Sequence, residues 1–136
     1  MIEFPFEKRR SQRLGPILKP FIPVRLIGPK NSETMLMLLD SGADLSLIPY
    51  SVGEAIGLEL DMNNRSEIQG IGEGSVPYIL SQVKLGIEEI EIPVRIGWAL
   101  IEEVPLLLGR LDVFGRFAIE FREFEDKILL KLQQEV

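Results

Sequence analysis

The feature that most restricts the fold is a regular alternation of apolar and polar residues on both sides of a short turn, in 82-QVKLGIEEIEIPVRIG-97. Apolar residues occupy positions 83, 85 and 87 before the turn and 90, 92, 94 and 96 after it. Successive side chains of a β-strand point to opposite faces, so this spacing indicates two adjacent strands that share one buried face. The turn between them is expected at 86–89.

Short runs of the same kind, separated by glycine- and proline-containing turns, fill the chain from position 17 onward. The run at 34–40 is almost entirely apolar, which is typical of a strand buried on both faces. Short helices are expected at 51–58 and 110–117, and Trp98 is expected to pack in a loop over 97–103. This pattern predicts an all-β domain of seven to nine short strands, arranged as a small barrel or sandwich. The expected strands cover 21–27, 34–40, 45–49, 66–80 (two halves around a glycine-rich tip), 82–97 (two strands), 104–109, 117–121 and 127–132.

Residues 1–16 differ from the rest because they combine mixed polarity with a basic cluster, 8-KRRSQR-13, and end in a glycine–proline pair. We expect an N-terminal arm over 1–16 and one domain over 17–136, since 136 residues are most simply one domain. Three interpretations of the arm are open: a disordered tail, a strand at a dimer interface, or a segment removed by self-cleavage.

The composition excludes several kinds of chemistry. The chain has neither cysteine nor histidine, so thiolate catalysis, zinc–thiolate sites and imidazole bases are impossible. Acid–base chemistry would have to use carboxylates, lysine or tyrosine. The net charge of −6 argues against nucleic acid as a partner, and no apolar stretch reaches membrane-spanning length. The charges near the N-terminus follow the apolar residues, the reverse of a secretory signal, so a cytoplasmic location is the expectation.

Two of the five aspartates lie within five positions, in 36-LMLLDSGADLSLIPYS-51. An ionised Asp40 at the end of a buried strand is costly unless it is paired or hydrogen-bonded. The turn that follows, Ser41 and Gly42, can direct backbone N–H groups toward that carboxylate. Two carboxylates brought together share a proton, so that one can activate water while the other protonates a carbonyl oxygen. Such a pair hydrolyses amide bonds without histidine, cysteine or metal.

The segment 38-LLDSGAD-44 resembles the active-site motif of the retropepsin-like (retroviral-protease-like) aspartic proteases. Two further segments occur in the family's order: 70-GIGEG-74, where the family has its flap, and 106-LLLGR-110, which resembles the segment before its single helix. The resemblance covers roughly 17–132. It implies a closed-barrel-like acid-protease single lobe with one or two short helices, active as a homodimer on peptide or protein substrates without metal or cofactor.

The resemblance also implies roles for individual residues. Asp40 would be catalytic within a dyad of two Asp40 side chains, and Asp44 would form an ion pair with Arg110 that locks the turn against the C-terminal helix. The family's second aspartate also meets the substrate backbone. The expected site comprises the catalytic turn Asp40, Ser41 and Gly42, the substrate-binding residues Ala43, Asp44, Gly70, Ile71 and Gly72, and the supporting residues Gly109 and Arg110.

Three other interpretations of the aspartate motif are open. Asp-Ser-Gly by itself is also a common turn sequence at a strand end. The same fold could serve as a catalytically silent, dimeric peptide-binding or scaffolding module, because fold does not fix function. A metal site at Asp40 and Asp44 is weaker, since two acids four positions apart supply too few ligands. Tyr78 is a further candidate contact near the expected flap.

Overall fold

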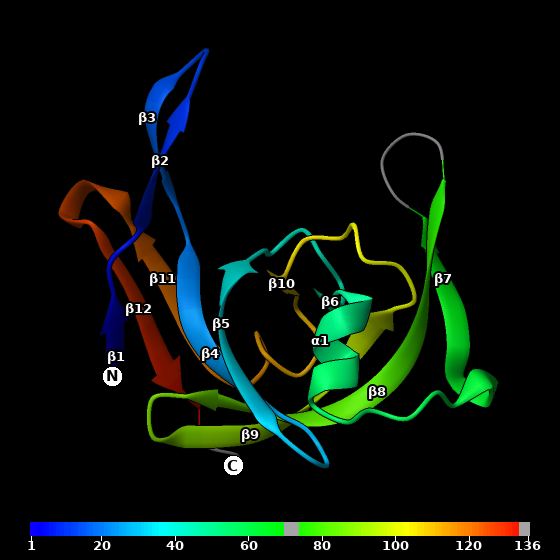
Figure 1. Ribbon diagram of the computed structural model, residues 1–136. Helices are drawn as coiled ribbons and strands as arrows, with labels where there is room; N and C mark the ends of the chain where they lie inside the picture. The colour runs from blue at the N-terminus through cyan, green and yellow to red at the C-terminus, as the bar shows by residue number, and fades with distance from the viewer. Residues whose placement is uncertain (70–73, 134–136) are drawn as a thin grey trace.

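The structure, a computed structural model, describes residues 1–69 and 74–133 and is mostly β (Figure 1). Its helical elements are α1 (Tyr50–Ala55) and the 3-10 turns η1 (Met62–Asn64) and η2 (Glu123–Glu125). The strands are β1 (Ile2–Phe4), β2 (Glu7–Ser11), β3 (Gly15–Lys19), β4 (Phe21–Ile27), β5 (Ser32–Leu39), β6 (Ser46–Ile48), β7 (Arg65–Gln69), β8 (Ser75–Ile87), β9 (Ile90–Ala99), β10 (Leu107–Leu108), β11 (Phe117–Arg122) and β12 (Lys127–Leu132).

A closed barrel forms the body of the molecule. Its strands follow the order β4-β5-β10-β6-β9-β8, and antiparallel pairing of β4 with β8 closes the ring. β7 pairs with the far part of β8 and is the edge strand of this sheet. The predicted all-β, closed-barrel architecture is therefore confirmed. The short helix expected at 51–58 is present as α1, which ends at Ala55. A separate sheet, β1-β12-β11, packs beside the barrel.

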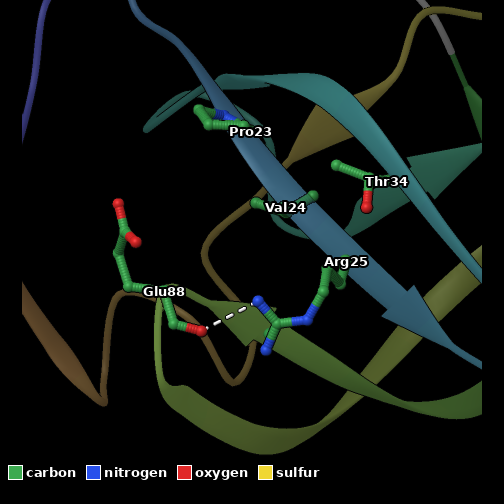
Figure 2. A pocket seen from close by; sticks show the side chains of 6 residues that line it. Pro23, Val24, Arg25, Thr34 and Glu88 are labelled. Carbon is green, nitrogen blue, oxygen red and sulfur yellow. Dashed lines mark hydrogen bonds between the residues drawn. The ribbon is translucent and has the colours of Figure 1, made fainter.

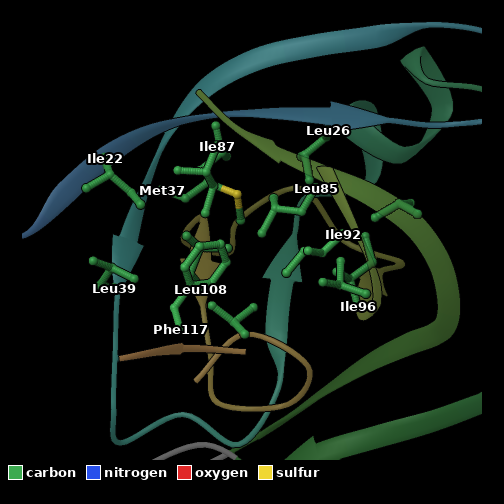
Figure 3. Packing of buried hydrophobic residues seen from close by; sticks show 14 of the residues in the cluster. Ile22, Leu26, Met37, Leu39, Leu85, Ile87, Ile92, Ile96, Leu108 and Phe117 are labelled. Atoms are coloured by element: carbon green, nitrogen blue, oxygen red, sulfur yellow. The ribbon is translucent and has the colours of Figure 1, made fainter. Parts of the chain in front are cut away.

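The alternation of apolar and polar residues over 82–97 directs one face of the β8–β9 hairpin into the core. Ile92, Val94 and Ile96 of β9 are buried, while the residues between them are exposed. Figure 3 shows Ile92 and Ile96 within the cluster of buried side chains. The prediction that 34–40 is buried on both faces was wrong. Met37 and Leu39 face the core, but Leu36 is 46% exposed because no described element covers the outer face of β5 there.

Arg25 fastens the β8–β9 turn to β4. Its guanidinium donates to the carbonyl oxygen of Glu88 at 2.8 Å, which Figure 2 shows beside a small hollow of about 170 Å³. Glu88 lies at the turn with φ 53°, a conformation that favours glycine. Gly86 leaves room for the arginine, since a Cβ there would lie 2.4 Å from its Nη2.

Trp98 lies in β9, so the predicted loop at 97–103 begins later than expected, after Ala99. The expectation that Trp98 is a packing residue is confirmed. It is 1% exposed, its Nε1 donates to the Tyr50 carbonyl at 2.9 Å, and the two rings stack 5.3 Å apart. Trp98 thereby ties α1 to the barrel.

The first residues contain three strands beyond those expected from position 17 onward. β1 pairs with β12, and Ile2, Phe4 and Phe6 are buried in the core. β2 and β3 form a separate two-stranded hairpin, and the expected division between residues 16 and 17 falls within β3. Among the described residues, no helix is long and apolar enough to cross a membrane.

Candidate active site

The turn after β5 holds the Asp40 carboxylate with backbone groups. The Gly42 N–H donates to Asp40 Oδ1 at 2.9 Å, which confirms the predicted contact between the turn and the carboxylate. The Asp40 N–H donates to the Leu108 carbonyl at 2.9 Å, and the Ala43 N–H donates to the Asp40 carbonyl at 3.2 Å. Hydrogen bonds to both the N–H and the carbonyl of Asp40 therefore fix the backbone from which its carboxylate extends.

β10 and the residue after it hold this turn in place, although they lie far from it in the sequence: Gly109 follows Ser46 by 63 positions. It pairs in parallel with β5 and antiparallel with β6, so it joins the two strands that flank the turn. The Gly109 N–H donates to the Ser46 hydroxyl at 3.0 Å, and Ser46 is completely buried. A Cβ on Gly109 would lie 2.5 Å from the Leu45 carbonyl carbon and 2.9 Å from the Ala43 oxygen, so only glycine fits.

The predicted ion pair between Asp44 and Arg110 is present, with Arg110 Nη1 3.8 Å from Asp44 Oδ1. It is a single long contact and not a bidentate one, and the Asp44 side chain is 96% exposed. Exposed pairs of this kind contribute about 0–1 kcal/mol. Two backbone hydrogen bonds tie the segments together more firmly, from Arg110 N–H to the Ala43 carbonyl at 2.8 Å and from Leu111 N–H to the Asp44 carbonyl at 2.9 Å.

The helix predicted at 110–117 was wrong, because the segment is a series of turns. Asp112 adopts φ 64°, which interrupts a right-handed helix. The Asp112 carboxylate instead accepts from the Arg95 backbone N–H at 2.9 Å and from two guanidinium nitrogens at 2.9 and 3.0 Å. These hydrogen bonds from Arg95 lower the pKa of Asp112 below its ordinary value of 3.8 and fasten the turn to β9.

A cleft of about 620 Å³ opens beside Asp40, within the size range of sites that bind small molecules or peptide side chains. One wall is the turn after β5, and the opposite wall is β7 with the adjoining part of β8. Its charged lining residues are all acidic. The lining residues are Asp40, Gly42, Ala43, Asp44, Leu45, Leu47, Glu67, Ile68, Gln69, Tyr78 and Leu107.

The structure thus brings most of the predicted site residues together. Ser41, which the structure also describes, is exposed and is not part of the cleft lining. Gly109 and Arg110 lie directly behind the turn. The predicted substrate-binding residues Gly70, Ile71 and Gly72 lie outside the described residues. Within 1–69 and 74–133, no three side chains among Asp, Glu, His and Cys gather to hold a metal ion.

Sequence reasoning missed two kinds of residue at this site. Ser46 was overlooked as the buried acceptor for Gly109, although a lone hydroxyl inside the apolar run 45-LSLIP-49 was a visible signal. The cleft walls Leu45, Leu47 and Leu107 were also missed, because their direction depends on how β6 and β10 pair. Tyr78, a weaker candidate, does line the cleft.

Comparisons with known proteins show a similarity to solved structures. No protein-family model matches the chain, and no curated protein matches it. Among solved structures, the chain is similar to EIAV protease complexed with the inhibitor HBY-793. The two are 25% identical over 68% of this chain and 82% of that chain, with a TM-score of 0.47.

Proposed function

We propose that this protein is an aspartic endopeptidase that hydrolyses peptide bonds through a water held between two Asp40 carboxylates of a homodimer. The observation that carries the proposal is the position of Asp40. Its carboxylate is oriented by the Gly42 N–H at one wall of a cleft, in a chain that has no histidine or cysteine to act as base or nucleophile.

A dyad requires a second chain, because the motif occurs once in this sequence. In a twofold dimer each Asp40 would face its own copy. Two adjacent carboxylates repel each other when both are charged, so the pair would hold one shared proton. The ionised member accepts a proton from the water, whose oxygen forms a bond to the peptide carbonyl carbon. The protonated member donates to the carbonyl oxygen, and a tetrahedral diol forms. The C–N bond of the diol then breaks, and the leaving nitrogen takes the proton that the first carboxylate accepted from the water.

An extended peptide is the substrate that this cleft suits. β7 is an edge strand of the barrel sheet, and Glu67, Ile68 and Gln69 of β7 line the cleft. An edge strand presents unpaired backbone groups to which a peptide can add as a further strand. The apolar lining residues Leu45, Leu47, Ile68 and Leu107 favour apolar side chains beside the scissile bond.

The competing proposal is a peptide-binding or scaffolding module with the same cleft and no catalysis. We would incubate an unbiased peptide pool at about pH 3.5–7 with the wild type, Asp40→Asn and the control Glu89→Gln, whose side chain is exposed in the β8–β9 turn. A protease loses roughly 10²–10⁴-fold or more of its activity in Asp40→Asn and none in Glu89→Gln. Equal cleavage by Asp40→Asn would refute the mechanism. Peptide binding without cleavage by any of the three would favour the module.

A further inference from the structure

The β2–β3 hairpin, residues 7–19, differs sharply in charge from the rest of the protein. It contains five basic residues and one acidic residue, a net charge of +4, whereas the whole chain carries −6, so the remainder carries −10. In Figure 1 the hairpin projects from the barrel at the upper left, and its two strands pair only with each other. An isolated two-stranded hairpin is marginally stable in water, so an uncovered one gains from docking.

The basic side chains of the hairpin divide between its two faces. Arg9 lies on one face, where it pairs with Glu7 at 2.7 Å and lies over the Phe21 ring at 4.8 Å. Lys8 and Arg10 lie on the opposite face, because neighbouring residues of a strand alternate. Both are exposed, and within the described part of the chain neither forms an ion pair. One face therefore presents uncompensated positive charge.

An apolar groove of about 390 Å³ lies at the base of this hairpin. Leu36, in its wall, is 46% exposed. From Leu36 the outward-facing positions of the chain run through Leu38 to Asp40, and four residues of strand span about 13 Å. The groove therefore reaches this face of the chain at Leu36, four positions before Asp40. It is lined by Phe4, Pro5, Phe6, Glu7, Phe21, Pro23 and Leu36.

We propose that the free face of the hairpin and this groove together form the surface that contacts a second copy of the chain. The proposal rests on the proposed function, which places Asp40 at the twofold axis. An interface of ordinary size buries about 800 Å² per partner, equivalent to a disc of about 16 Å radius, so one centred on Asp40 reaches Leu36 and the groove. Within this interface the groove supplies an apolar area and the hairpin a charged rim.

The distribution of charge favours another copy of this chain, and not a polyanion, as the partner that binds the hairpin and the groove. In a twofold dimer each +4 hairpin meets a body of charge −10, and both copies gain the same contact. A nucleic acid or an anionic membrane would instead approach a chain with a net charge of −6.

The test is the oligomeric state of Lys8→Glu/Arg10→Glu, measured by sedimentation equilibrium at low and high salt. The control is Lys30→Glu/Lys84→Glu, which changes the net charge equally and places both exposed substitutions near the opposite end of β4. We expect the hairpin variant to raise the dimer dissociation constant about tenfold or more, with the control unchanged. Far-UV circular dichroism checks that both variants are folded.

A second measurement uses the wild type alone. Carbodiimide coupling of mixed ¹⁵N-labelled and unlabelled protein should join the Lys8 amine to a carboxylate of the other copy.

A monomeric wild type, or a hairpin variant that dimerises like the control, would overturn the proposal. So would a hairpin variant that loses binding to an oligonucleotide or anionic vesicles while its dimer is intact. None of these readouts depends on peptide cleavage, so a hairpin-dependent dimer without activity refutes only the protease.

Discussion

Gly109→Ala tests whether close packing between β10 and the Asp40 turn holds the candidate site together. The added methyl group would lie 2.5 Å from the Leu45 carbonyl carbon and 2.6 Å from its oxygen. These are backbone atoms, so the strain cannot be relieved by rotating a side chain. Overpacking of this kind costs about 1–3 kcal/mol, which we take as the expected loss in the free energy of unfolding.

Gly115→Ala is the matched control. A methyl group added at Gly115 would meet no atom within 4 Å, and the φ of this residue is outside the left-handed region. The same substitution there should leave the free energy of unfolding unchanged or raise it by up to about 1 kcal/mol, because alanine restricts the unfolded chain.

The assay is urea unfolding followed by the fluorescence of Trp98, the only tryptophan of the chain. Trp98 is buried and stacked on Tyr50, so its emission should report loss of the barrel. All proteins are compared at one concentration, since dissociation of a dimer adds to the apparent stability. In thermal unfolding the expected loss corresponds to about 3–12 °C for a chain of this size. A Gly109→Ala protein within about 0.5 kcal/mol of Gly115→Ala would refute the packing argument.

Two further predictions concern the charged residues near the site. The Arg95 hydrogen bonds lower the pKa of Asp112, so this carboxylate contributes stability above its ordinary pKa of 3.8, and the contribution is lost as the pH falls through the lower folded-state value. Urea midpoints measured from neutral pH down to about pH 2.5 should therefore fall more steeply for the wild type than for Asp112→Asn, and parallel curves would contradict this. Asp44→Asn removes an exposed pair with a 3.8 Å contact, so it should change the free energy of unfolding by less than about 1 kcal/mol. A larger loss, measured by the same urea assay, would show that the pair supports the turn more than its exposure indicates.

Much of the barrel was predictable from periodicity, because the strands that line it have one buried face. The alternation across 82–97 predicted the second part of β8, all but the end of β9 and the turn between them. β8 is one strand over Ser75–Ile87, whereas two separate pieces were expected there. The first residues could have been assigned by the same rule, since Ile2, Phe4 and Phe6 alternate and are buried. The basic cluster that follows them hid this signal, as its charges are typical of a solvent-exposed tail.

Other features depend on contacts that no local pattern encodes. Asp112 lies in a segment with the polar spacing of a helix, but its left-handed φ and its hydrogen bonds to Arg95 are set by packing against β9. Likewise, the exposure of Leu36 depends on which elements cover β5. At the site, the motif predicted the Asp40 carboxylate and its partner turn, whereas the cleft walls followed from the pairing of β6, β10 and β7.

The hydrogen bond between Ser46 and Gly109 spans 63 positions, which has a consequence for the order in which the protein is made. A ribosome adds about 5–20 residues per second, so the Asp40 turn waits several seconds for the segment that fastens it. Long-range contacts also form late in folding, because the entropy of closing the loop is lost before they stabilise the chain. We expect a nascent or truncated chain that ends before β10 to lack an ordered Asp40 turn. Under the proposed function, hydrolytic activity would then arise only after β10 has been synthesised and has paired with β5 and β6.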